Sequence, residues 1–285
     1  MKAPAFAYAR PRSRDEVFEL LARYGDDARL LAGWQSLLAS LGMRLSAPAV
    51  LIDINGVADL AGIRVAGDAV RIGALARHRE VERSPVVARH LPLVARAMPH
   101  VAHAAIRNRG TFGGSLCNAD PAAEWPACAV ALDATLVLAG RAGERRVKAR
   151  EFFRGLYETA LEPGEILVAG EFRRIAAGER AAFGELARRH GDYAIVGLAA
   201  QARFTEGRIA AASLAFFGVG ATPVLAAGAA AALTQQPCTP DAIAAAQDAL
   251  ASDLEPFDDV HHSAATKLHL ARVLLGRLVG ELIGK

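Results

Sequence analysis

Two short segments of the chain combine glycines with hydroxyl side chains, a combination that can bind a phosphate group. The first is Ala32-Gly33-Trp34-Gln35-Ser36 and the second is Thr111-Phe112-Gly113-Gly114-Ser115. Glycine lets backbone N–H groups approach an anion closely, and the hydroxyl groups add further donors. Either segment alone is also consistent with an ordinary glycine turn, and for residues 32–36 alone the turn is the favoured interpretation. It is their pairing in one chain that points to a nucleotide site.

Two acidic residues follow the second segment closely. Pro121 is expected to begin a helix, with Asp120 as its cap and Glu124 about one turn inside it. Capping occupies the Asp120 carboxylate, so Glu124 is the better candidate to accept hydrogen bonds from sugar hydroxyls.

Metal chemistry and nucleophilic catalysis have little support in the sequence. The three cysteines show no C-x-x-C spacing, and His100 and His103 have no further ligand nearby in sequence. An iron–sulfur cluster held by cysteines needs four thiolates, which this chain cannot supply. No G-x-S-x-G segment is present. Redox chemistry would therefore require an organic cofactor or a partner chain.

Composition narrows the class of protein further. The chain has 285 residues, of which 53% are hydrophobic, and a net charge of +3. The basic clusters are short and interspersed, so nucleic-acid binding is not expected. The sequence contains no run of about 18 apolar residues, which is the length that a membrane span needs, and the N-terminus lacks an apolar signal core. We expect a cytoplasmic protein.

The elements that position these segments change in type along the chain. Residues 13–57 are predicted to form a small α/β unit with helices at 13–24 and 36–45 and strands at 28–31 and 50–54. An antiparallel α+β section follows, with a hairpin at 63–72, a helix at 86–98, and strands at 132–138 and 166–175. After a linker at 176–179, the pattern predicts three strands (183–188, 195–204, 209–219) and three helices (224–233, 240–251, 260–283).

Five motifs in order resemble the FAD-binding medium subunits of molybdenum hydroxylases, such as the carbon monoxide dehydrogenase medium chain and the flavin domain of xanthine dehydrogenase. That family carries A-G-G-x-S, L-x-D-I-N, I-R-N-x-G-T-x-G-G-x, A-D-P-A-A-E and R-R-x-G-D-[YF]-A-x-V. The matching segments here are Ala32–Ser36, Leu51–Asn55, Ile106–Ser115, Ala119–Glu124 and Arg188–Val196. The resemblance covers nearly the whole chain.

The resemblance implies an α+β fold with two domains. The first, residues 1–175, would be a two-part FAD-binding domain of the vanillyl-alcohol oxidase (PCMH) type, divided at about residue 57 into parts 1–57 and 58–175. The second, residues 179–285, would be the C-terminal α+β domain of the carbon monoxide dehydrogenase flavoprotein, with a three-stranded antiparallel sheet and helices.

The resemblance also implies a set of FAD-binding residues. Segments 32–36 and 111–115 would hold the pyrophosphate with backbone N–H groups and the Thr111 and Ser115 side chains. Glu124 would bind the ribitol or ribose region, and Tyr193 would lie beside the isoalloxazine ring. The full expected set is Ala32, Gly33, Trp34, Gln35, Ser36, Val101, Ile106, Asn108, Thr111, Phe112, Gly113, Gly114, Ser115, Asp120, Glu124, Leu167 and Tyr193.

Two positions depart from the family pattern. Trp34 stands where the family usually has a second glycine, so we expect either a negative φ there or a different loop backbone. We also expect its indole to pack over part of the FAD or against a partner chain. Gly184-Glu185 stands where xanthine dehydrogenase-like chains often have a lysine near the flavin.

The function implied by the resemblance is electron transfer. A large partner subunit would carry a molybdopterin cofactor and a small one would carry two [2Fe–2S] clusters, and the complex would be a dimer of heterotrimers. The FAD would pass electrons to NAD, oxygen, a quinone or a cytochrome. A structural nucleotide-binding subunit with weak or lost FAD binding is the alternative. A stand-alone flavin oxidase is disfavoured because no substrate base is evident.

Overall fold

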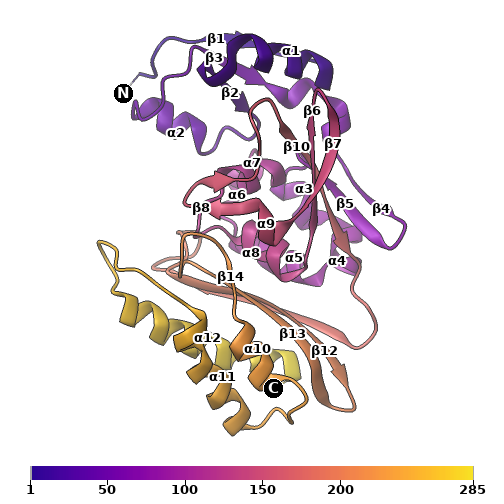
Figure 1. Ribbon diagram of the computed structural model, residues 1–285, viewed down its shortest axis with the longest axis vertical. Helices are drawn as coiled ribbons and strands as arrows, with labels where there is room; N and C mark the ends of the chain where they lie inside the picture. Colours follow the sequence, from indigo (N-terminus) through magenta and orange to yellow (C-terminus); the bar gives the residue numbers. More distant parts are fainter. Residues whose placement is uncertain (1, 285) are drawn as a thin grey trace.

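The computed structural model describes residues 2–284 and has the α+β architecture expected from the sequence (Figure 1). Its N-terminal part is a parallel sheet in the order β1-β3-β2, flanked by two helices. These elements are β1 (Ala7–Ala9), α1 (Arg14–Tyr24), β2 (Ala28–Leu31), α2 (Leu37–Gly42) and β3 (Val50–Asp53). Strand β1 was not predicted, and α2 is shorter than the predicted helix 36–45.

Local sequence explains where α1 begins and what it buries. The Ser13 hydroxyl accepts the Glu16 N–H at 3.2 Å and caps the helix. Val17 and Phe18 are buried against the parallel sheet. This packing holds the end of β2, from which the first glycine segment departs, in a fixed position.

The middle part is an antiparallel five-stranded sheet in the order β4-β5-β10-β6-β7 with short helices around it. The strands are β4 (Ile63–Ala66), β5 (Ala69–Gly73), β6 (Thr135–Gly140), β7 (Gly143–Lys148) and β10 (Ile166–Arg173). A small hairpin is formed by β8 (Phe153–Gly155) and β9 (Glu158–Thr159). The helices are α3 (His78–Arg83), α4 (Pro85–His90), α5 (Pro92–Ala97), α6 (Ala104–Arg107), α7 (Phe112–Asn118), α8 (Glu124–Ala131) and α9 (Ala149–Phe152). The described residues of the N-terminal and middle parts also form four short 3-10 helices: Gly25–Asp27, Ile54–Gly56, Ala58–Leu60 and Met98–His100.

The prediction of one helix over residues 86–98 is wrong. The structure has two helices, α4 and α5, separated at Leu91, whose φ of −132° and ψ of 61° are not helical. Pro92 is the reason, because proline disfavours the helical conformation in the residue before it and lacks the N–H that a continuous helix needs.

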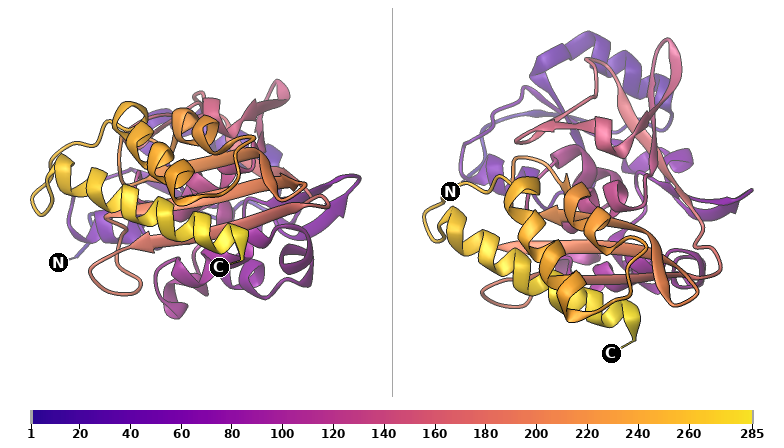
Figure 2. Two further views of the ribbon diagram at one scale, coloured as in Figure 1. Left: turned by 90° about the horizontal axis from the view of Figure 1, so that it is seen from below. Right: turned by 60° about the horizontal axis from the view of Figure 1, so that its bottom comes forward.

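The C-terminal part is a four-stranded antiparallel sheet covered by three helices. The elements are β11 (Glu179–Leu186), β12 (Val196–Thr205), β13 (Arg208–Phe217), β14 (Val224–Leu225), α10 (Ala227–Leu233), α11 (Pro240–Asp253) and α12 (Ala264–Ile283). Figure 2 shows the three helices together on one face of the sheet. The predicted three-stranded sheet lacked β14, which was assigned to the start of a helix because Val224 and Leu225 continue into an alanine-rich run.

Side chains alternate between the two faces of this sheet. Leu198 and Phe216 belong to the core beneath helices α10–α12, whereas Phe183, Ala199 and Phe217 belong to the core of the middle part. The sheet therefore packs against the middle part of the chain through its second face. Of the helices in residues 2–284, none is both long and apolar enough to cross a membrane.

Candidate functional site

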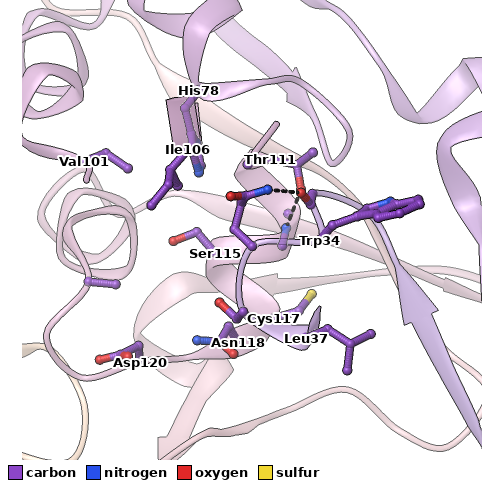
Figure 3. Close-up of a pocket in the computed structure, with 18 of the residues that line it drawn as sticks. Trp34, Leu37, His78, Val101, Ile106, Thr111, Ser115, Cys117, Asn118 and Asp120 are labelled. Carbon is purple, nitrogen blue, oxygen red and sulfur yellow. Dashed lines mark hydrogen bonds between the residues drawn. The ribbon is translucent and has the colours of Figure 1, made fainter. Parts of the chain in front are cut away.

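A cavity of about 600 Å³ lies where the three parts of the chain meet, and both glycine segments line it (Figure 3). Its wall is formed by the end of β2 and the loop after it, the β5–α3 corner, the segment from Val101 to Asp120, the start of α8, and the loops carrying Tyr157 and Tyr193. This volume is within the range of pockets that enclose a nucleotide-sized ligand.

The first glycine segment, here called the first loop, touches the second loop, residues 106–115, which contains the second glycine segment. A Cβ built on Gly33 would come within 2.8 Å of the Gly110 Cα and 3.0 Å of the Arg109 carbonyl oxygen. A Cβ on Gly113 would lie 2.8 Å from the Ala74 carbonyl oxygen. The glycines are thus required for backbone packing between the loops as well as for access to a ligand.

Several carbonyl groups of these loops accept hydrogen bonds from side chains. The Asn55 amide donates to the Ala32 carbonyl at 2.9 Å, and the Gln35 side chain donates to the Gly33 carbonyl at 2.9 Å. The Arg77 guanidinium donates to the Arg109 carbonyl of the second loop. These bonds occupy carbonyl groups of both loops and fix the loop backbones relative to each other.

The L-x-D-I-N motif supports this arrangement. Asp53 accepts hydrogen bonds from the Asn55 backbone at 3.0 Å and from the Tyr8 hydroxyl at 2.5 Å. Asn55 in turn accepts from Arg77, so a continuous chain of hydrogen bonds runs from Tyr8 to the second loop. Burial acts to raise the pKa of Asp53, but the bonds from Tyr8 and Asn55 hold it below its usual value.

The first loop has unused donors. Within residues 2–284, no backbone N–H from Gly33 to Ser36 has an acceptor in the protein. Ser36 is the N-cap residue of α2, yet its hydroxyl makes no capping bond. Backbone N–H groups rarely lie idle in a folded protein, so a row of them along a cavity indicates an anionic ligand.

The second loop behaves differently from the prediction. The N–H groups of Phe112, Gly113 and Gly114 already donate to Ala76 O (2.9 Å), Ala74 O (2.8 Å) and Thr111 Oγ1 (3.1 Å), respectively. The expectation that they bind the pyrophosphate is therefore wrong, because they tie α7 to the β5–α3 corner. What this loop offers the cavity is the hydroxyl groups of Thr111 and Ser115.

Trp34 has a left-handed backbone conformation. Its φ is +72°, so the first of the two expected alternatives, a negative φ, is wrong, and the second, a different loop backbone, stays a prediction. The indole packs beside Leu31 and Leu41 with the Arg109 guanidinium 5.6 Å from the ring centroid. In Figure 3 it points away from the other labelled side chains. Trp34 also belongs to the cavity lining, and its buried indole Nε1 has no hydrogen-bond partner among the described residues, so its packing over FAD or against a partner chain stays a prediction.

All but two of the sequence-predicted site residues line the cavity. The exceptions are Asn108, which is exposed at the end of α6, and Phe112, which is fully buried. The Phe112 ring lies 4.8 Å from Trp125, edge to face, in the core. Its motif position is explained by packing under the loop.

The acidic residues occupy positions other than those expected. Helix α8 begins at Glu124, with Ala123 as N-cap, so Pro121 does not begin it. The Asp120 carboxylate instead accepts from the Ala122 N–H at 2.9 Å and the Tyr157 hydroxyl at 3.3 Å. The predicted role of Asp120 as a helix cap is thus wrong, although its bond to Ala122 is of the local Asx type.

Glu124 is part of a buried charged group behind the cavity. Burial raises the pKa of Glu124 to about 7, with Glu185 adding to the rise. The Glu185 side chain is 5% exposed, with one oxygen 3.5 Å from His100 Nδ1 and the other without a hydrogen-bond partner. The bond to Glu185 raises the pKa of His100. Glu185 is therefore a buried carboxylate that favours a protonated Glu124.

Two tyrosines lie at the mouth of the cavity. Tyr193 is 69% exposed and Tyr157 is 58% exposed, and both belong to the cavity lining. Tyr157 has a φ of +57°, an uncommon conformation that the β8–β9 turn imposes. Tyr193 was predicted from the sequence but Tyr157 was not, because nothing in a hairpin turn marks a tyrosine as part of a distant site.

Two further residues of the site were not predicted, Arg77 and His78. They follow β5 in the run Arg77-His78-Arg79, which reads as a charged helix start. Only the folded chain shows that Arg77 bridges both loops and that His78 lines the cavity. Among residues 2–284, no group of His, Cys, Asp and Glu side chains could hold a metal ion.

Comparison with known proteins agrees with this geometry. Residues 4–171 match the family model described as the FAD binding domain in molybdopterin dehydrogenase. The chain belongs to the FAD-binding subunits of the molybdenum hydroxylases. Residues 181–282 match the CO dehydrogenase flavoprotein C-terminal domain. As a member of this family, the chain is an oxidoreductase subunit whose cofactor is FAD.

Individual relatives span almost the full chain. The 6-hydroxypseudooxynicotine dehydrogenase complex subunit alpha of Paenarthrobacter nicotinovorans is 38% identical, over 99% of this chain and 96% of its own. The structure of carbon monoxide dehydrogenase from Hydrogenophaga pseudoflava superposes with a TM-score of 0.96 at 38% identity, covering 99% of this chain and 98% of its own. Quinoline 2-oxidoreductase from Pseudomonas putida 86 gives 0.94 at 39% identity, with coverage of 99% and 98%.

Proposed function

We propose that this chain holds one FAD in the cavity and relays electrons from a small partner subunit to an external acceptor. The small subunit would carry two [2Fe–2S] clusters, and a large subunit would oxidise the substrate at a molybdenum cofactor. Three observations support the need for partners. The chain has three cysteines, none of its described residues forms a metal site, and relatives are described as medium chains or subunits of complexes.

The observation that carries the proposal is the row of unused N–H groups at Gly33–Ser36 facing a loop that contributes hydroxyls. Such a site fits the pyrophosphate of a dinucleotide, which offers oxygen acceptors to both sides. Thr111 and Ser115 would donate to it from the second loop. This donor set suits a phosphate ligand and would be unsuited to an apolar one.

The remaining lining residues suit the other parts of FAD. Glu124 would bind ribityl or ribose hydroxyls, and Tyr193 would lie beside the isoalloxazine ring. Val101 and Leu167 are buried apolar residues that would exclude water from the ligand. When bound, the flavin supplies the capacity to exchange one or two electrons, whereas the protein positions it and tunes its surroundings.

Several finer features of the proposal follow from the family. We assign the FAD-binding domain to residues 1–175, with parts 1–57 and 58–175, and the C-terminal domain to residues 179–285. We also propose a cytoplasmic complex that is a dimer of heterotrimers. The sheet β11–β14 is fixed to the FAD-binding half through Phe183 and Phe217, so the flavin would sit on a rigid platform.

Purification of the chain from its native host with its partners tests this function. We expect a large and a small subunit to co-purify, with molybdenum and about four iron atoms per FAD. Rapid anaerobic mixing with a substrate that the large subunit oxidises should reduce the flavin and bleach its absorbance band. A chain that purifies alone, or a complex whose flavin stays oxidised while its clusters are reduced, would contradict the proposal.

A further inference from the structure

His78 occupies the floor of the cavity although no sequence motif marks it. It is the first residue of α3, directly after the β5–α3 corner, and it is 5% exposed. The ring belongs to the cavity lining and lies on the same side as Ile106 and Val101 in Figure 3. A nearly buried imidazole in a ligand cavity must have its two ring nitrogens accounted for.

One nitrogen is fixed by Trp125. The indole Nε1–H donates to His78 Nδ1 at 3.0 Å, and Trp125 is fully buried. An indole can only donate, so Nδ1 must be the unprotonated acceptor. The remaining ring proton therefore resides on Nε2, and the tautomer is set by the fold.

The ring is also neutral. Burial, together with the positive charges of Arg107 and Arg77, lowers the pKa of His78 to about 4. Arg107 reaches this region from α6 and contacts the Glu82 carboxylate of α3 at 3.3 Å. His78 is thus an uncharged donor at Nε2 throughout the neutral pH range.

The Nε2 edge faces the second loop. A Cβ built on Gly110 would lie 2.8 Å from Nε2, so the ring edge occupies the space that a side chain would fill. Among the described residues, Nε2 has no hydrogen-bond acceptor in the protein. Within the described residues, two side-chain atoms are buried from solvent and have no hydrogen-bond partner, Trp34 Nε1 and Glu185 Oε2. His78 Nε2 is not one of them, so it is accessible. Nε2 of His78 is therefore open to the cavity.

We infer that His78 is a further FAD-binding residue, which donates its Nε2–H to an oxygen of the pyrophosphate or the adjoining ribose. The inference rests on the proposed placement of FAD in this cavity. Trp125 acts as a positioning residue, because its indole fixes the proton on the nitrogen that faces the ligand. A neutral donor here binds the dinucleotide without a charge that would vary with pH.

Nuclear magnetic resonance of the flavin-free chain labelled with ¹⁵N-histidine tests the inference. His78, assigned with a His78→Phe variant, should show the Nε2–H tautomer between pH 6 and 8. Addition of FAD should move its Nε2–H resonance without protonating Nδ1. An unmoved His78 signal in a chain that binds FAD would overturn the inference. A chain that binds no FAD at all would instead overturn the proposed function.

Affinity measurements give an independent readout. His78→Phe should weaken FAD binding about 10-fold, the scale of one lost hydrogen bond to a charged or polar acceptor. His78→Gln places an amide N–H near the Nε2 position and should recover most of that loss. Trp125→Phe should leave a mixture of tautomers in the His78 spectrum. Equal FAD affinities for the wild type and His78→Phe, with matching circular dichroism, would contradict the inference.

Discussion

Gly33 lies directly against Gly110, so that a Cβ on Gly33 would approach the Gly110 Cα to 2.8 Å. This contact joins two segments that are far apart in sequence and brings unused N–H groups of one loop opposite the hydroxyls of the other. Because both backbones are involved, neither loop can shift without moving the other. The spacing between the loops is therefore a property of their glycines.

Gly33→Ala should separate the loops and weaken FAD binding by at least 10-fold, because the added methyl meets backbone atoms that cannot rotate away. Gly42→Ala is the matched control, since a Cβ there meets nothing within 4 Å and the residue lies in α2. The control should bind FAD normally and gain up to about 1 kcal/mol of stability from its helix propensity. Titration of flavin-free protein with FAD measures the affinity of each variant. Similar affinities for the two variants would show that the contact between Gly33 and Gly110 is not needed for FAD binding.

Arg77 should be needed for FAD binding without touching the ligand. Its guanidinium joins Asn55 to the Arg109 carbonyl, and a single ammonium cannot reproduce that fork. We expect Arg77→Gln and Arg77→Lys both to weaken FAD binding about 10-fold. Arg79→Gln, on the same helix but paired with Glu82, should change it less than twofold. A Lys variant with wild-type affinity would show that charge alone matters.

The protonation of Glu124 should make folding stability depend on pH. Its pKa is raised from 4.5 to about 7, so the folded chain holds a proton that the unfolded chain loses, and stability falls as pH rises through this window. The loss by pH 8 is at most about 3 kcal/mol. Glu124→Gln removes this titration, so the variant should gain stability relative to wild type between pH 5 and pH 8. Denaturant unfolding at both pH values measures the difference.

The control for that experiment is Glu19→Gln, which alters an exposed glutamate on α1. Its stability relative to wild type should be the same at pH 5 and pH 8. If Glu124→Gln also shows no change between the two pH values, Glu124 is ionised in the folded chain and the buried group with Glu185 and His100 does not retain a proton.

Trp34 should store backbone strain that glycine would relieve. The left-handed conformation costs a residue with a Cβ about 1 kcal/mol relative to glycine. Trp34→Ala and Trp34→Gly both lose the indole's contacts with Leu31 and Arg109, but only the glycine variant loses the strain. Thermal unfolding should therefore show that the free energy of unfolding of Trp34→Gly is about 1 kcal/mol higher than that of Trp34→Ala. The reverse order would mean that the φ of +72° is not strained.

The sequence was sufficient to predict the architecture and most of the cavity wall, for identifiable reasons. Ser13 and Glu16 mark the start of α1, and Gly67-Asp68 marks the β4–β5 hairpin, because capping and turn chemistry act over a few residues. The helix at 86–98 was mispredicted because its apolar pattern continues through Pro92, whereas proline interrupts the backbone.

The parts of the site that the sequence did not reveal depend on contacts across the fold. Arg77 bonds to the carbonyl of a residue 32 positions away, and Trp125 fixes a histidine 47 positions away. Likewise, the N–H groups of Gly113 and Gly114 are occupied through tertiary and capping contacts. No local pattern encodes which donors a folded loop has already used.

The central claim is that this chain binds FAD through the cavity between its two loops. Titration of the purified flavin-free chain with FAD, followed by the flavin absorbance retained after gel filtration, tests it most directly. We expect one FAD per chain in the wild type and a much weaker complex for Gly33→Ala. A wild-type chain that remains colourless after saturation with FAD would contradict the account and support a subunit that has lost its cofactor.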